Sequence, residues 1–131
     1  MNVAATPGEK TQLRGIERRS TPRFDARGRI LGHFEAENTP VRIRELGLHG
    51  FSIETLGPVP AGQIMKIRFT SYDDWSTVLQ AKSIHSRPSC TADGLPCFVT
   101  GFSFIQEPAR DAETIVRYMI EKVTSVAFFG N

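Results

Sequence analysis

The sequence of 131 residues is 40% hydrophobic and 23% charged, which fits one globular domain with its own core and excludes a largely disordered chain. Its net charge of +2 is uneven, because residues 1–31 carry seven Lys or Arg against three acidic residues. We therefore expect an anionic partner near the N-terminus, and a small phosphorylated ligand rather than a nucleic acid polymer, which requires a larger basic face.

The N-terminal residues 1–17 are small and polar, with a break at Thr6-Pro7-Gly8, and we expect them to form a flexible segment. The first ten residues lack the apolar core of a signal peptide. No stretch approaches the ~20 consecutive apolar residues of a membrane span. We therefore expect a cytoplasmic protein that does not insert into a membrane.

A basic run follows, with the sequence Arg18-Arg19-Ser20-Thr21-Pro22-Arg23. Pro22 disfavours helix at Thr21 and fixes its own φ angle, so the run is expected to be extended. An arginine side chain offers a planar set of donors that matches phosphate oxygens or the O6/N7 edge of guanine. Arg19 and Arg23 could then grip one compact anion, although a short charged run is also typical of solvated surface.

Six short β-strands are predicted after this run, because apolar and polar residues alternate with the period of a half-buried strand. They cover residues 29–35, 41–45, 51–55, 65–69, 77–84 and 98–104. Ile84 falls out of phase with Ala81, which favours a β-bulge, and residues 86–96 are predicted to form an exposed hairpin loop. Since turns rather than helices separate the strands, we predict a closed antiparallel barrel or sandwich.

A closing helix is predicted over residues 108–126. Pro108 suits the first turn of a helix, and Asp111 favours its positive N-terminal end. The apolar residues that follow recur at i, i+3, i+4 spacing, so we expect one face of this helix to pack on the strands. Residues 128–131 are predicted to form a short tail.

No catalytic or metal-binding motif is recognised. Asp73 and Asp74 are adjacent in a predicted loop, where they point to different sides, which is poor geometry for an acid–base pair. His33, His49 and His85 are isolated from one another and from any nucleophile motif. We therefore expect a protein that is not an enzyme and that needs no metal or cofactor.

From residue 18 to about residue 127, the chain resembles the PilZ domain family. The RxxxR motif of that family stands intact as Arg19-Ser20-Thr21-Pro22-Arg23. Its second motif, [D/N]xSxxG, is degenerate, because the matching segment is Glu45-Leu46-Gly47-Leu48-His49-Gly50 and keeps only the last glycine. Other family-like stretches are Gly50-Phe51-Ser52-Ile53-Glu54, Val59-Pro60-Ala61-Gly62 and Gly101-Phe102-Ser103-Phe104.

The resemblance implies a mainly all-β fold, a six-stranded antiparallel β-barrel with a C-terminal helix and a flexible basic N-terminal arm. The expected bounds are residues 18–28 for the arm, 29–106 for the barrel and 108–126 for the helix. The family is known as bacterial receptors for cyclic di-GMP, in which the arm arginines grip guanine and phosphate. Arg18, Arg19 and Arg23 are therefore expected to bind the ligand.

The resemblance also implies ligand contacts from the barrel. Glu45 keeps a carboxylate that accepts hydrogen bonds from guanine N1 and N2, but it is one methylene longer than the Asp of the family. Gly47 has lost the serine hydroxyl, and Gly50 would let the ligand approach closely. His85 ends the fifth predicted strand, where PilZ barrels often line the ligand site.

Two functions remain open at this point. The first is a cyclic di-GMP receptor whose arm orders on the dinucleotide and signals through contacts with a protein partner. The alternative is a divergent PilZ adaptor that does not bind cyclic di-GMP and acts by protein–protein contacts in pilus, motility or biofilm control. The degenerate second motif favours the adaptor and the intact RxxxR motif favours the receptor. In either case we expect a monomer or a weak dimer.

Overall fold

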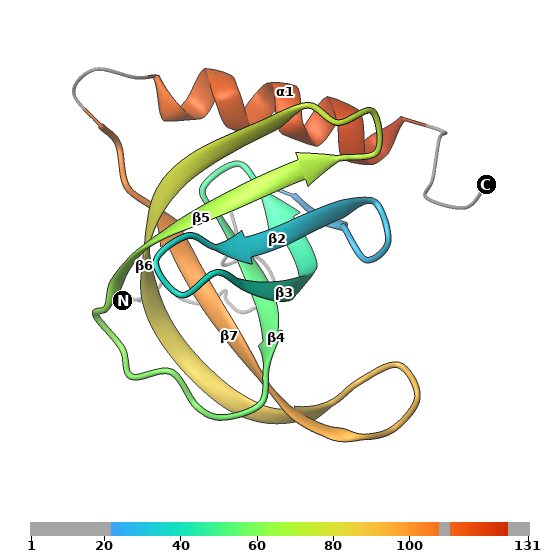
Figure 1. The fold of residues 1–131 in the computed structure, drawn as a ribbon, viewed down its shortest axis with the longest axis vertical. Helices are drawn as coiled ribbons and strands as arrows, with labels where there is room; N and C mark the ends of the chain where they lie inside the picture. The colour runs from blue at the N-terminus through green and yellow to red at the C-terminus, as the bar shows by residue number, and fades with distance from the viewer. Residues whose placement is uncertain (1–21, 108–110, 126–131) are drawn as a thin grey trace, which may run out of the picture.

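The computed structural model describes residues 22–107 and 111–125, which form one antiparallel sheet that curves into a barrel beneath a helix (Figure 1). The strands are β1 (Arg23–Asp25), β2 (Ile30–Phe34), β3 (Thr39–Gly47), β4 (Gly50–Thr55), β5 (Ile64–Ser71), β6 (Ser76–Cys90) and β7 (Pro96–Phe104). The sheet order is β1-β3-β2-β5-β6-β7-β4, and a further pairing of β3 with β4 closes it. The six strands β2 to β7 therefore form the predicted barrel, which the pairing of β3 with β4 closes.

Strand β1 lies outside this barrel and extends it along one edge of β3. Residues 39–41 of β3 pair with β2, whereas residues 45–47 pair with β1. Part of the arm predicted at residues 18–28 is therefore an ordered strand, because β3 continues past its pairing with β2 and its free edge can accept the chain. Residues 18–21 lie outside the described part of the chain.

The core is built on aromatic contacts between strands that are distant in the sequence. Phe51 of β4 is fully buried and stacks on Phe102 of β7, with ring centroids 5.1 Å apart and an interplanar angle of 2°. Phe51 also meets Phe69 of β5 edge-on at 5.1 Å. Such pairs contribute about 0.5–1.5 kcal/mol beyond the burial of their area. They fix the register of β4 against β7, two strands that carry the site described below.

A β-bulge interrupts β6 between Ser83 and His85, which confirms the bulge predicted from the lost alternation. Before the bulge, Ala81 and Ser83 are buried on the inner face. After it, Ser86 faces inward and its hydroxyl is hydrogen-bonded to Thr100 inside the barrel. One extra residue reverses the face on which every following side chain lies. His85 is thereby directed to the outer face.

The prediction of a loop at residues 86–96 is wrong for residues 86–90. Strand β6 continues to Cys90, and the connection is confined to residues 91–95. The pairing of β6 with β5 ends at Lys82, so the last part of β6 has only β7 beside it among the described strands. A strand with a free edge accommodates proline, which explains why Pro88 does not end it. The β6–β7 hairpin consequently projects beyond the barrel (Figure 1).

Helix α1 (Ala112–Thr124) lies across one end of the barrel (Figure 1). Its N-cap is Asp111, whose side chain accepts a hydrogen bond from the Thr114 backbone N–H at 3.3 Å, so the helix begins later than the predicted Pro108. The buried face that packs on the barrel consists of Ala112, Val116, Met119 and Val123. The ends of the predicted helix, at 108–110 and 126, lie outside the described residues. In the described ranges, no helix is both long and apolar enough to cross a bilayer.

Candidate ligand-binding site

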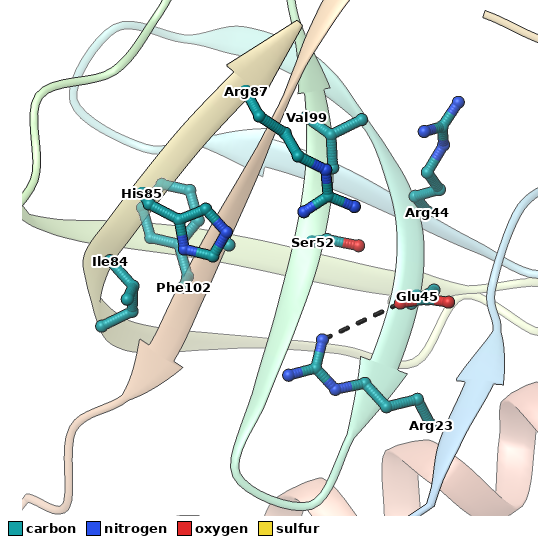
Figure 2. A pocket seen from close by; sticks show the side chains of 10 residues that line it. Arg23, Arg44, Glu45, Ser52, Ile84, His85, Arg87, Val99 and Phe102 are labelled. Atoms are coloured by element: carbon teal, nitrogen blue, oxygen red, sulfur yellow. Dashed lines mark ion pairs between the residues drawn. The ribbon is translucent and has the colours of Figure 1, made fainter. Parts of the chain in front are cut away.

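A cavity of about 370 Å³ lies on the outer face of the sheet, over β3, β4, β7 and β6 (Figure 2). Its floor is a row of paired residues that crosses all four strands. Glu45 lies opposite Ser52, Ser52 opposite Gly101, and Gly101 opposite His85. The other lining residues are Arg23, Arg44, Ile84, Arg87, Val99 and Phe102. The volume falls within the range of ~300–1,000 Å³ that is usual for small-molecule sites.

Two β-bulges direct the side chains of this floor outward. The bulge in β6 directs the side chain of His85, at one end of the row, to the outer face. A second one interrupts β3 between Ile43 and Glu45 and was not expected from the sequence. Ile43 and Leu46 are both buried, whereas Arg44 and Glu45 between them are only half-buried. Bulges of this kind re-aim side chains beside functional sites.

The charge of the cavity is positive. Arg23, Arg44 and Arg87 line it, against a single carboxylate, that of Glu45. Arg23 Nη1 lies 3.8 Å from Glu45 Oε1, which is an ion-pair distance too long for a hydrogen bond. The side chain of Arg87 makes no hydrogen bond or ion pair with residues 22–107 or 111–125. The arrangement therefore favours an anionic ligand.

Arg44 differs from the other arginines because its donors are committed to the fold. Its Nη1 donates to Ser89 Oγ at 3.1 Å and its Nη2 to the Cys90 carbonyl oxygen at 2.5 Å, which ties β3 to the end of β6. Its Nε lies 3.2 Å from Oε2 of the buried Glu54, an ion pair without the alignment of a hydrogen bond. Arg42 contacts the same carboxylate at 3.5 Å. Arg44 contributes positive charge and shape to the cavity rather than an available donor.

Ser52 forms the centre of the floor. Its residue exposure is 6%, and its Oγ has no hydrogen-bond partner among the described residues. Gly101 beside it has no side chain, and a Cβ placed there would lie 3.8 Å from Cε1 of His85. No side chain at position 101 therefore covers the floor between Ser52 and His85.

Three of the predicted site residues, Arg23, Glu45 and His85, are brought together by the structure in this cavity. Gly47 is not among its lining residues. Gly47 lies opposite Arg23 in the β1–β3 pair, and a Cβ added to it would lie 3.2 Å from the Pro22 carbonyl oxygen. The missing side chain at this position therefore lets the arm pack closely on β3.

Gly50 does not line the cavity either, and packing explains its lack of a side chain. A Cβ at Gly50 would lie 2.2 Å from the carbonyl oxygen of Phe102, which is closer than such atoms can approach. Glycine is thus needed for β4 to pair with β7 at this point. Arg18 and Arg19 fall outside the described residues.

Sequence reasoning missed Arg44, Ser52, Arg87 and Gly101 as site residues. Arg87 fell within the predicted loop at residues 86–96. Alternation placed Ser52 on the polar face of its strand, but nothing local indicates which residues lie opposite it. That information comes from the pairing of strands that are far apart in the chain.

The family model for the PilZ domain matches residues 17–121, which is most of the chain. The chain belongs to the PilZ domain family. This confirms the resemblance carried by the RxxxR motif and the barrel pattern. The family comprises cyclic di-GMP receptors, some of which regulate motility, and its domains are non-catalytic binding modules. This PilZ domain is therefore not an enzyme.

Two solved structures are similar to this PilZ domain. The PilZ domain with c-di-GMP of YcgR from Escherichia coli matches with a TM-score of 0.60 and 18% identity, over 81% of this chain and 91% of that one. The Bacillus subtilis inhibitor of motility MotI/DgrA matches with a TM-score of 0.57 and 16% identity, over 89% of this chain and 56% of that one. This PilZ domain thus spans little more than half of the MotI/DgrA chain. At these identities the likeness establishes the fold. A search of curated proteins found no significant match.

Proposed function

We propose that this PilZ domain binds cyclic di-GMP in the cavity over β3, β4, β7 and β6. The proposal rests on the composition of that cavity, which is lined by three arginines and one carboxylate. One of the three, Arg23 of β1, is the second arginine of the RxxxR motif. The similar fold of the YcgR PilZ domain, whose structure contains c-di-GMP, supports the same ligand class.

Arg23 and Arg87 are the proposed phosphate contacts. In Figure 2 their guanidinium groups lie on either side of Ser52, and both residues line the same cavity. A hydrogen bond to a charged group contributes about 1.5–3 kcal/mol, and the flat guanidinium matches two phosphate oxygens at once. Arg19 and Arg18, which precede β1 in the arm, are proposed to add contacts from outside the barrel.

Glu45 is proposed to accept hydrogen bonds from N1 and N2 of guanine. To do so, Glu45 gives up its present ion pair with Arg23 in favour of the base. That ion pair spans 3.8 Å, and the side chains of Glu45 and Arg23 are 43% and 33% exposed. Exposed ion pairs of this kind contribute only ~0–1 kcal/mol, so the exchange costs little. The His85 ring, at the other end of the floor, offers a flat surface beside the same base.

Strand β1 offers a route from the ligand to a protein partner. Arg23 lines the cavity, whereas Phe24, the next residue, lines an apolar groove together with Leu48 and Ile120 of α1. A ligand that draws Arg23 into the cavity also moves Phe24 against the helix. Ordering of the arm and a changed α1 surface would then convert binding into a signal.

The experiment that tests this proposal is a calorimetric titration of the protein with cyclic di-GMP, with GTP as the control nucleotide. Saturable binding in the micromolar range or tighter, selective over GTP, is the expected result. Absence of binding at roughly hundredfold higher concentration would contradict the proposal, since it would mean a loss of about 2.7 kcal/mol or more of binding free energy.

The second candidate function is the adaptor that acts through protein contacts alone. The degenerate motif favours it, because Gly47 supplies no hydroxyl and packs under the arm instead. Its docking surface would be the apolar groove of Phe24, Leu48 and Ile120. A titration without binding would support this function, and the search would turn to protein partners of the α1 face.

A further inference from the structure

Ser52 carries a buried hydroxyl that the fold does not use. The other buried serines and threonines with described bonds are satisfied, because Ser71 donates to the Trp75 carbonyl oxygen, Ser83 to the Pro60 carbonyl oxygen, and Thr100 contacts Thr55. Ser52 Oγ has no partner within the described ranges although the residue is only 6% exposed. Buried polar groups are nearly always paired, so this exception calls for a partner that residues 22–107 and 111–125 do not supply.

The position of Ser52 explains why the described part of the chain supplies no partner. Strand β4 is paired on both sides at this residue, with Glu45 of β3 and with Gly101 of β7. The neighbouring backbone groups are therefore engaged in the sheet. Glu45 keeps its carboxylate near Arg23, and Gly101 has no side chain to offer. Ser52 lines the cavity above the floor, so a ligand in this cavity lies beside the residue that carries the buried hydroxyl.

We propose that Ser52 and Glu45 together read the base edge of the ligand, with Ser52 Oγ as the hydroxyl that Gly47 lacks. This inference rests on the proposed binding of cyclic di-GMP. Residues directly opposite on paired strands have Cβ atoms about 4.5–5.5 Å apart, a spacing that suits adjacent groups on one base. The carboxylate accepts from guanine N1 and N2, and the hydroxyl donates to O6.

The pair also discriminates between purines. Adenine presents an acceptor, N1, where guanine presents the N1–H donor, so the Glu45 carboxylate would face a lone pair. A site built to hydrogen-bond specific ligand atoms rejects an analogue that leaves its polar groups unpaired. Cyclic di-GMP is therefore preferred over cyclic di-AMP, and Ser52 supplies part of that preference.

The test compares the full chain with Ser52→Ala and, as a matched control, Ser71→Ala. Ser71 is also a buried serine, but it lies at the end of β5 and its hydroxyl is bonded to Asp73 and Trp75. Each protein is titrated calorimetrically with cyclic di-GMP and with cyclic di-AMP, and its melting temperature is measured without ligand.

For Ser52→Ala we expect cyclic di-GMP affinity to fall about tenfold, the preference over cyclic di-AMP to narrow, and the ligand-free melting temperature to stay unchanged or rise. That variant loses no side-chain hydrogen bond among the residues that the structure describes. Ser71→Ala should show the opposite pattern, a lower melting temperature with unchanged affinity.

Two outcomes would overturn the inference, and they differ from failure of the proposed function. If the unaltered protein and Ser52→Ala bind cyclic di-GMP with equal affinity, Ser52 does not contact the ligand, and the receptor function still stands. If the melting temperature of Ser52→Ala falls together with its affinity, Ser52 has a structural role instead. Absence of binding by the unaltered protein would reject the receptor function and this inference together.

Discussion

Arg23 of the arm lies directly opposite Gly47 of the degenerate second motif, as partners in the β1–β3 pair. The two motifs are therefore in contact, and the residue at position 47 sets how closely the arm approaches the barrel. A Cβ at Gly47 would lie 3.2 Å from the Pro22 carbonyl oxygen. The glycine at position 47 is thus a packing feature, and it also lacks the serine hydroxyl of the family motif.

Gly47→Ala is expected to loosen β1. The added methyl crowds the Pro22 carbonyl oxygen, and overpacking of this kind costs about 1 kcal/mol or somewhat more. Thermal unfolding should show a modest loss of stability, and hydrogen exchange should show faster exchange of the β1 amides. Gly57→Ala is the control, since a Cβ there meets nothing within 4 Å. Unchanged exchange at β1 in Gly47→Ala would argue against the close packing.

Arg23→Ala and Arg87→Ala are each expected to weaken cyclic di-GMP binding by about 10- to 100-fold, because each removes a charge-assisted contact worth about 1.5–3 kcal/mol. Calorimetric titration checks the affinity, and circular dichroism should show an intact barrel. Arg117→Ala provides the matched control, because Arg117 is paired with Glu113 on α1 and does not line the cavity. Equal loss of affinity in all three variants would point to a general charge effect instead of specific clamps.

Gly101→Leu is expected to block the site without unfolding the domain. A side chain at Gly101 rises into the cavity, and its Cβ meets only Cε1 of His85 at an ordinary 3.8 Å. Binding should fall below detection by calorimetry while the melting temperature changes little. Ser103→Leu, two residues along β7 and outside the cavity lining, should keep its affinity. Retained binding in Gly101→Leu would mean that the ligand lies elsewhere.

The connection between β5 and β6 is held to α1 by a salt bridge that should make stability depend on pH. Lys122 Nζ lies 2.6 Å from Asp73 Oδ2, and the hydrogen bond from Lys122 lowers the pKa of Asp73 from 3.8 to about 2. A lowered folded-state pKa stabilises the fold above pH 3.8, and this contribution is lost as the pH falls through that range toward 2.

Asp73→Asn should therefore be less stable than the unaltered protein in urea denaturation at pH 7, and the difference should vanish near the pKa of about 2. Asp74→Asn serves as the control, because it removes the neighbouring carboxylate and leaves the salt bridge of Asp73 with Lys122 intact. A stability difference between Asp73→Asn and the unaltered protein that stays constant from neutral to acid pH would contradict a role for the charge of Asp73.

Local sequence patterns predicted most of the fold. Alternation of apolar residues located the six barrel strands, and its interruption at Ile84 located the bulge in β6. The same reasoning failed at residues 86–90, where Pro88 indicated a loop. Pro88 is tolerated because β6 no longer has β5 beside it there, which is a property of the sheet and not of the segment.

The sequence by itself determined the family, the basic arm and three members of the cavity, Arg23, Glu45 and His85. The pattern of alternation and the RxxxR motif are local, so they can be read without knowing the neighbours. The tertiary structure alone decided that Ser52 and Gly101 complete the floor and that Gly47 packs under the arm. The physical reason is strand register, since each of these relationships depends on which residues lie opposite one another across strands that are remote in the chain.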